Sequence, residues 1–225
     1  MLRSFKVHGK NRALFGIGLC VLLILFIFFY SYFLNLFISK PLSYGAKDVI
    51  FRIIIWLFLG AIYLSAAKIE KKPFLLWEEE RYAVDFYVLS VIVLLGVSTI
   101  LGAIIGIPFN HSINERFHHK VQLMDHLSKP VKYVGVVTAA FCEELIFRGY
   151  LIPRLHLFFK NTWYPIVISA LLFSFCHLGY QTMFYVFYTL AVGLLFGYHY
   201  QKYRNIKVLI LFHFLWDYYL LISVS

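Results

Sequence analysis

The chain has 225 residues, of which 61% are hydrophobic and 14% charged, and its mean hydropathy is +0.77. This composition excludes a soluble domain and predicts an integral membrane protein. The formal net charge of +10 does not indicate nucleic-acid binding, because the basic residues are scattered among short connections and no soluble basic face is predicted. Anionic lipid headgroups are the expected partner of these charges.

Apolar windows recur along the chain at lengths close to the ~20 residues that a helix needs to cross a bilayer. We therefore predict an all-α, polytopic transmembrane helical bundle that forms one domain over residues 1–225. The first window is too long for the apolar part of a signal peptide, so we interpret it as a retained span. About seven spans are predicted, at 14–38, 49–67, 83–107, 131–153, 163–179, 181–200 and 206–224.

The distribution of Lys and Arg between the connections predicts the orientation. If the N-terminus is cytoplasmic, the cytoplasmic segments hold thirteen of these residues and the segments on the other side hold six. Positive residues concentrate on the cytoplasmic side of membrane proteins. The expected location is therefore a bacterial cytoplasmic membrane, with the N-terminus inside and the C-terminus outside.

The connection at 108–130 has apolar residues at three- and four-residue steps, which predicts an amphipathic helix lying along the membrane surface. Its opposite face carries four histidines, which we interpret as a solvated face in preference to a metal patch. These are His111, His118, His119 and His126.

Charged residues near the ends of predicted spans are also interpreted as solvated. The stretch WEEER at 77–81 reads as an interfacial Trp followed by a hydrated charge cluster. Arg52 and Asp85 lie near span ends, where a side chain that reaches the interface is a sufficient account.

The fourth predicted span carries charges near its middle, in AAFCEELIFRGY at 139–150. Glu144 and Arg148 are four residues apart, so on an α-helix they share a face and form an ion pair that neutralises itself. Glu143 is rotated by about 100° from Glu144 and is expected to project into the bundle without a fixed counter-charge. Burial raises the proton affinity of such a carboxylate, which makes Glu143 the candidate general base.

Two later spans add histidines. His177 follows Phe173 by one turn, and His213 precedes Asp217 by four residues, so that this carboxylate is placed to orient or charge the imidazole. A charged group within a span costs at least about 2.5–3.5 kcal/mol. One shared interior site satisfies the polar groups of three helices more readily than separate burial does.

These residues resemble three motifs of the CPBP family, which contains the CAAX prenyl endopeptidases and bacteriocin-processing or immunity proteins. EELIFR at 143–148 fits Glu-Glu-x-x-x-Arg, FSFCH at 173–177 fits Phe-x-x-x-His, and HFLWD at 213–217 resembles His-x-x-x-Asn/Asp. The motifs cover roughly 131–220, in the family's order. The resemblance implies a polytopic α-helical bundle with an intramembrane peptidase site.

The resemblance also implies a role for each residue. Glu143 would be the base that activates a water together with His177. His213 and Asp217 would stabilise the oxyanion, with Glu144 and Arg148 supporting the motif helix. Many family members have Asn at the position of Asp217, and an ionised Asp cannot donate to an oxyanion. Either Asp217 is protonated, or it orients His213 and another donor completes the oxyanion site.

Metal dependence stays open at this level. Family members are often described as metalloproteases, and Glu143, His177 and His213 would supply two His and one carboxylate to a catalytic zinc. The chain has no His-Glu-x-x-His helix, and a glutamate-plus-histidine mechanism needs no ion. We favour a peptidase that requires no cofactor.

The sequence therefore predicts an endopeptidase that cuts a membrane-associated or lipidated peptide or protein, whose identity it does not reveal. One alternative is a non-catalytic membrane partner such as a bacteriocin self-immunity factor. A proton-coupled carrier is less favoured because no inverted repeat is visible. A thiol protease built on Cys142 or Cys176 is disfavoured because each Cys diverges by about 100° from the adjacent Glu143 or His177.

Overall fold

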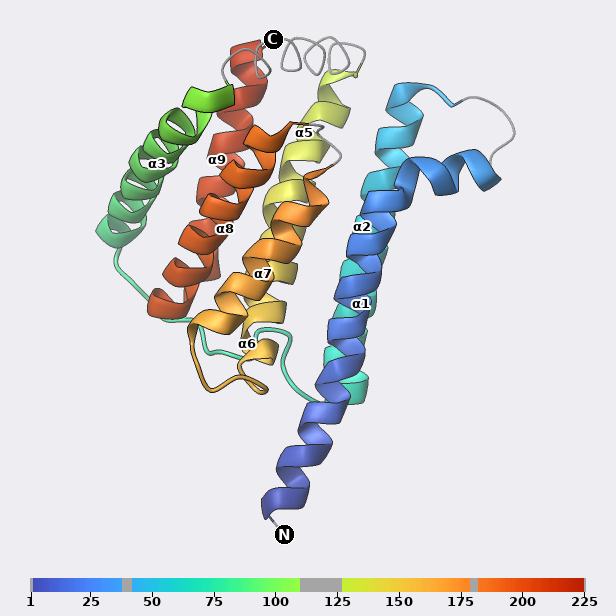
Figure 1. Ribbon diagram of the computed structural model, residues 1–225, viewed down its shortest axis with the longest axis vertical. Coiled ribbons are helices and arrows are strands. Elements are labelled where there is room, and N and C mark those ends of the chain that lie inside the picture. The colour runs from blue at the N-terminus through green and yellow to red at the C-terminus, as the bar shows by residue number, and fades with distance from the viewer. Residues whose placement is uncertain (1, 38–41, 110–126, 179–181, 225) are drawn as a thin grey trace.

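The computed structural model describes residues 2–37, 42–109, 127–178 and 182–224, and every regular element among them is helical. The long helices run side by side along the length of the molecule (Figure 1). The elements are α1 Leu2–Phe37, α2 Tyr44–Leu64, η1 Ser65–Glu70, α3 Val84–Gly106, η2 Ile107–Phe109, α5 Lys129–Thr138, η3 Ala139–Leu151, α6 Ile152–Leu155, α7 Trp163–Cys176, α8 Met183–Tyr203 and α9 Ile206–Val224.

The predicted all-α bundle is confirmed, and among the described residues five helices are long and apolar enough to cross a bilayer. These cover Lys10–Tyr30, Tyr44–Glu70, Val84–Phe109, Met183–Tyr203 and Ile206–Ser223.

The other two predicted spans do not meet that description. The span predicted at 163–179 is the 14-residue helix α7, shorter than the ~20 residues required. The span predicted at 131–153 belongs to the continuous helical run from α5 to α6, which carries Glu143, Glu144, Arg148 and Arg154. The structure therefore supports five candidate spans where the sequence predicts about seven.

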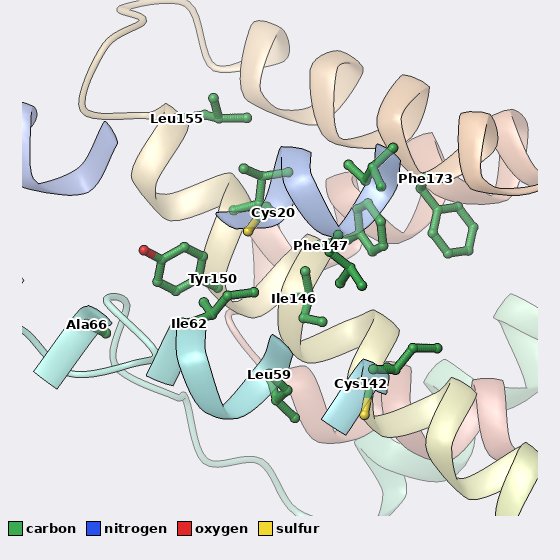
Figure 2. Packing of buried hydrophobic residues seen from close by; sticks show 14 residues of the cluster. Cys20, Leu59, Ile62, Ala66, Cys142, Ile146, Phe147, Tyr150, Leu155 and Phe173 are labelled. Atoms are coloured by element: carbon green, nitrogen blue, oxygen red, sulfur yellow. The ribbon is translucent and has the colours of Figure 1, made fainter. Parts of the chain in front are cut away.

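Two apolar clusters hold the bundle together. The first joins α1 and α2 to η3 and α7, through residues such as Cys20, Ile62 and Phe147 (Figure 2). The second joins α3, α8 and α9, through residues such as Leu94 and Phe212. The helix run α5–η3–α6 lies between the N-terminal pair α1–α2 and the C-terminal helices, and contacts both.

The central part of that run, η3, is a π-helix of 13 residues. Sequence periodicity predicts α-helical winding here. A π-helix forms i→i+5 hydrogen bonds, is rare, and occurs mostly as single turns that are often found at functional sites. The predicted contact between Glu144 and Arg148 is nevertheless confirmed, with Arg148 Nη1 3.1 Å from Glu144 Oε1.

The prediction of a hydrated charge cluster at 77–81 is wrong for Glu79. Its carboxylate accepts a hydrogen bond from the Ile206 amide at 2.7 Å and one from the Tyr200 hydroxyl at 3.2 Å. The pKa of the Glu79 carboxyl is raised above its ordinary value because the group is buried, and these two hydrogen bonds offset part of that rise. The segment therefore packs against the turn between α8 and α9. Glu78, Glu80 and Arg81 are exposed, as predicted.

The amphipathic helix predicted at 108–130 and its histidines, His111, His118, His119 and His126, fall almost entirely within 110–126, which lies outside the described residues. This surface helix stays a prediction. The first and last described helices, α1 and α9, start and finish at opposite ends of the molecule (Figure 1), which is the arrangement expected if the termini lie on opposite sides of the membrane.

Candidate active site

The imidazole of His213, on α9, is the centre of a polar cluster within the apolar bundle. Its Nδ1 lies 2.8 Å from Glu144 Oε1 on η3. Its Nε2 lies 3.6 Å from Asp217 Oδ2 and 4.0 Å from Glu143 Oε2. Because an ionised carboxylate only accepts hydrogen bonds, the close contact assigns a proton to Nδ1, which donates to Glu144. The carboxylates of Glu143 and Asp217 lie near the other ring nitrogen, Nε2.

Glu144 and Arg148 form the buried side of this cluster, with side chains 0% and 1% exposed. The guanidinium of Arg148 lies over the ring of Phe173 on α7 at 4.2 Å and over the ring of Phe196 on α8 at 5.2 Å. Cation–π contacts of this kind strengthen when the groups are removed from water. The ion pair of η3 therefore packs against α7 and α8, and Glu144 also contacts His213 of α9.

His177 follows the last residue of α7 and has φ −94° and ψ 0°. Its Nδ1 lies 2.9 Å from the Phe173 carbonyl oxygen, and the Phe173 ring lies 4.7 Å from its own ring. Since a carbonyl oxygen only accepts, Nδ1 carries the proton, and Nε2 of the neutral ring is an acceptor. Phe173 therefore contacts both Arg148 and His177.

The structure changes two of the contacts that the sequence predicts. Asp217 is predicted to orient or charge His213; its 3.6 Å contact is longer than a hydrogen bond but within the range of an ion pair, and Glu144 makes the short contact. Glu143 is predicted to have no fixed counter-charge, yet it lies near His213. The side chains of Glu143 and Asp217 are 27% and 29% exposed, against 13% for His213. These two carboxylates are thus the accessible members of the cluster.

Helices η3 and α9 together contribute four of the predicted residues to this cluster: Glu143, Glu144, His213 and Asp217. His177 is connected to them by way of Phe173 and Arg148. Phe196 is a member that motif reasoning missed. An isolated aromatic residue in an apolar helix carries no sequence signal for such a role.

The arrangement does not match the zinc site that the sequence permits. Within the described residues, no group of three or more His, Cys, Asp and Glu side chains is placed to hold a metal ion, and this includes the set Glu143, His177 and His213. Zinc ligands lie about 2.0–2.2 Å from the ion. His213 instead directs Nδ1 to Glu144, with Glu143 and Asp217 beside Nε2.

Comparison with known proteins supports the resemblance that the motifs suggest. Residues 130–219 match the family described as type II CAAX prenyl endopeptidase Rce1-like. No curated protein and no solved structure matches the chain. The matched segment begins at the second residue of α5 and contains every member of the polar cluster, whereas α1, α2 and α3 precede it. Residues 130–219 are therefore a domain of the Rce1-like type II CAAX prenyl endopeptidase family.

Proposed function

We propose that the protein is an intramembrane endopeptidase that hydrolyses a peptide bond in a membrane-associated or lipidated peptide or protein. The observation that carries this proposal is the placement of His213 against two adjacent glutamates. Glu144 contacts one ring nitrogen, and the accessible Glu143 lies near the other. Family membership supports a peptidase, and the comparisons give no support to bacteriocin immunity.

In the proposed reaction, Glu143 accepts a proton from a water molecule, assisted by Nε2 of His177. The water oxygen bonds to the carbonyl carbon of the substrate, and the carbonyl oxygen becomes an oxyanion. Collapse of this intermediate breaks the carbon–nitrogen bond, and the proton held by Glu143 passes to the departing amine. The products are one carboxylate and one amine, so a single water is consumed.

His213 is the proposed donor to the oxyanion. Glu144 holds the Nδ1 proton in place and favours a positive charge on the ring, so that a protonated Nε2 points toward the side occupied by Glu143 and Asp217. Removing one such donor costs about 10²–10³ in rate in hydrolases. Asp217 then supports the charge on His213 and need not donate itself.

No resident cofactor takes part in this proposal. Its partners are the peptide substrate and the lipid bilayer, and nucleic acid is not among them. Exposed basic residues near the start of α1 and after η1, such as Arg12, Lys71 and Lys72, support a cytoplasmic N-terminus, and we propose a bacterial cytoplasmic membrane.

The proposal is tested with the full chain reconstituted in phospholipid vesicles. Three substrates are compared: a farnesylated peptide ending in a C-a-a-X sequence, its unprenylated counterpart, and an apolar leader peptide. The reaction is run in ¹⁸O-water, and mass spectrometry measures label in the new carboxylate. Label in one product, lost in His213→Ala, is the expected result. If none of the three is cut while the vesicles contain folded protein, the chain lacks the proposed activity on these substrate classes.

Asp217→Asn is expected to retain hydrolysis within about tenfold of the wild type. The replacement keeps the shape of a side chain that makes no short hydrogen bond to His213, and amide groups still donate. Asp217→Leu, which removes the polar group, is expected to lose considerably more. Initial rates for both variants measure the difference, and equal losses would show that the negative charge of Asp217 is required.

Cys142→Ser and Cys176→Ser are each expected to leave hydrolysis within about threefold of the wild type. Cys142 is buried within the first apolar cluster, and the Cys176 thiol donates to the Leu172 carbonyl at 3.4 Å. Neither is placed as a thiolate–imidazole nucleophile. The same peptide assay, with and without iodoacetamide, checks this. Loss of activity in either variant would favour a thiol mechanism.

A further inference from the structure

The helical run α5–η3–α6, here named the signature helix, is contacted by α2–η1 at polar positions that the sequence does not reveal. Near the start of this contact, Arg52 Nη1 on α2 donates to the Gly135 carbonyl oxygen at 3.0 Å. One turn later, Trp56 Nε1 donates to Thr138 Oγ1 at 3.1 Å. A Cβ atom on Gly135 would lie 2.9 Å from the Arg52 guanidinium, so a larger residue there would displace the end of the Arg52 side chain. Arg52 lies near the start of α2, as predicted, and its side chain is 23% exposed and pairs with Asp48 at 3.0 Å, so the bond to Gly135 is an additional contact that the sequence does not reveal.

A second set of contacts joins the far ends of the same two helices. Glu70, the last residue of η1, accepts hydrogen bonds from the Tyr150 hydroxyl and from Arg154 Nε, the latter at 3.1 Å. Arg154 also donates to the carbonyl oxygens of Pro73, at 2.9 Å, and Phe74. The side chains of Glu70, Tyr150 and Arg154 are buried, and that of Arg154 is 0% exposed. The contact is thus a polar network whose charged groups lie inside the bundle.

The two sets of contacts keep one register along the helices. The partners in the first set are 83 and 82 residues apart in sequence. The partners in the second set are 80 and 84 apart. A nearly constant separation means that α2–η1 and α5–η3–α6 run parallel, each residue facing its counterpart. Figure 2 shows the apolar residues between the two sets, where Leu59 and Ile62 of α2 lie near Ile146 and Tyr150 of η3.

This register matters because the segment between the two sets of contacts is the π-helix η3. An α-helix turns by about 100° per residue, and a helix with i→i+5 bonds turns by less. Reversion of η3 to α-helical winding would rotate Tyr150 relative to Thr138. Thr138 and Tyr150 can keep their contacts with α2–η1 at the same time only if η3 stays π-helical. In this winding Glu143 and Glu144 lie near His213.

We propose that α2–η1 holds the signature helix in its π-helical winding, and that Trp56 and Glu70 are positioning residues for Glu143 and Glu144. The inference rests on the proposed peptidase function for its kinetic consequence, while its structural consequence is independent of that function. The proposal gives α2–η1, which precedes the family match that begins at residue 130, a role in positioning the glutamates.

Two substitutions each delete one hydrogen bond from this contact. Trp56→Phe removes the donor to Thr138, and Tyr150→Phe removes the donor to Glu70. Matched controls are Trp163→Phe and Tyr63→Phe, since these side chains are exposed and the latter lies on the same α2. Hydrogen–deuterium exchange of the full-length protein is measured over peptides covering 139–151. We expect exchange about five- to tenfold faster in both test variants and unchanged in both controls.

The second readout is peptide hydrolysis in vesicles. A positioning role predicts that kcat falls about tenfold in each test variant while KM stays within twofold, because small misplacements of catalytic groups act on the chemical step. A merely structural contact would lower the melting temperature and the active fraction, and titration of active sites separates that outcome. Unchanged exchange in Trp56→Phe and Tyr150→Phe overturns the inference. If exchange is faster in the two test variants but the wild-type protein cuts no peptide, the proposed function alone is overturned.

Discussion

Glu143→Gln is expected to abolish peptide hydrolysis, with kcat reduced by about 10²–10⁴. Glutamine has the shape of glutamate but does not accept a proton from water at neutral pH. The side chain lies 4.0 Å from His213 Nε2 and is 27% exposed, so the replacement disturbs little packing. Initial rates in vesicles and the melting temperature of the purified protein measure the two effects separately.

The matched control is Glu78→Gln, which makes the same chemical change at an exposed position and is expected to keep full activity. Binding of the uncut peptide to Glu143→Gln should remain close to that of the wild type. If Glu143→Gln hydrolyses the peptide at the wild-type rate, Glu143 is not the base. If a biological role of the protein survives this substitution, a binding function such as immunity replaces the peptidase.

The polar contacts within one helix could be predicted from the sequence. Glu144 and Arg148 are four residues apart, and this spacing brings them together at 3.1 Å even though the helix is π-wound. His213 and Asp217 show the limit of the same rule. Their spacing places them on one face, but the distance of 3.6 Å depends on side-chain rotamers that spacing does not determine.

Contacts between helices could not be predicted, because they depend on how the helices pack. His213 and Glu144 are 69 residues apart, and no periodicity indicates which of two adjacent glutamates faces a helix so distant in sequence. The π-helical winding of η3 could not be predicted from the sequence for a similar reason. Local propensities do not favour i→i+5 bonds, so contacts from α2, such as that of Trp56 with Thr138, are needed to select it.

The predicted span at 131–153 differs from the five candidate spans for a related reason. The window at 131–153 is apolar apart from its charged residues, so hydropathy alone predicts an ordinary span. Its charged residues have partners within the protein: Glu144 pairs with Arg148 of the same helix and contacts His213 of α9, and Arg154 pairs with Glu70 of η1. The charged side chains of this helix face other parts of the bundle, whereas apolar side chains such as Val134 and Phe141 are exposed on its outer face.

Arg154→Met is expected to lower the free energy of unfolding by about 3–5 kcal/mol, because it leaves the buried Glu70 carboxylate without its counter-charge. Arg154 donates to Glu70 at 3.1 Å and to the Pro73 carbonyl at 2.9 Å, and its guanidinium lies 3.9 Å from the centre of the Tyr150 ring. Unfolding by SDS in mixed micelles measures the loss. Arg81→Met, at an exposed arginine, is the matched control and is expected to have little effect.

The double variant Glu70→Gln, Arg154→Met separates two explanations of that loss. If the cost is that of an unpaired buried charge, neutralising Glu70 should restore a large part of the stability, since a buried ion pair replaced as a whole is often close to neutral. If the cost comes from the lost contacts of Arg154 with Pro73 and Phe74, the double variant should be as unstable as Arg154→Met. We expect the first outcome, because carbonyl groups near a loop regain hydrogen bonds from water, whereas a carboxylate enclosed by η1 and η3 does not. A loss below about 1 kcal/mol in Arg154→Met itself, the range of exposed ion pairs, would show that water reaches this network and that it does not anchor the signature helix.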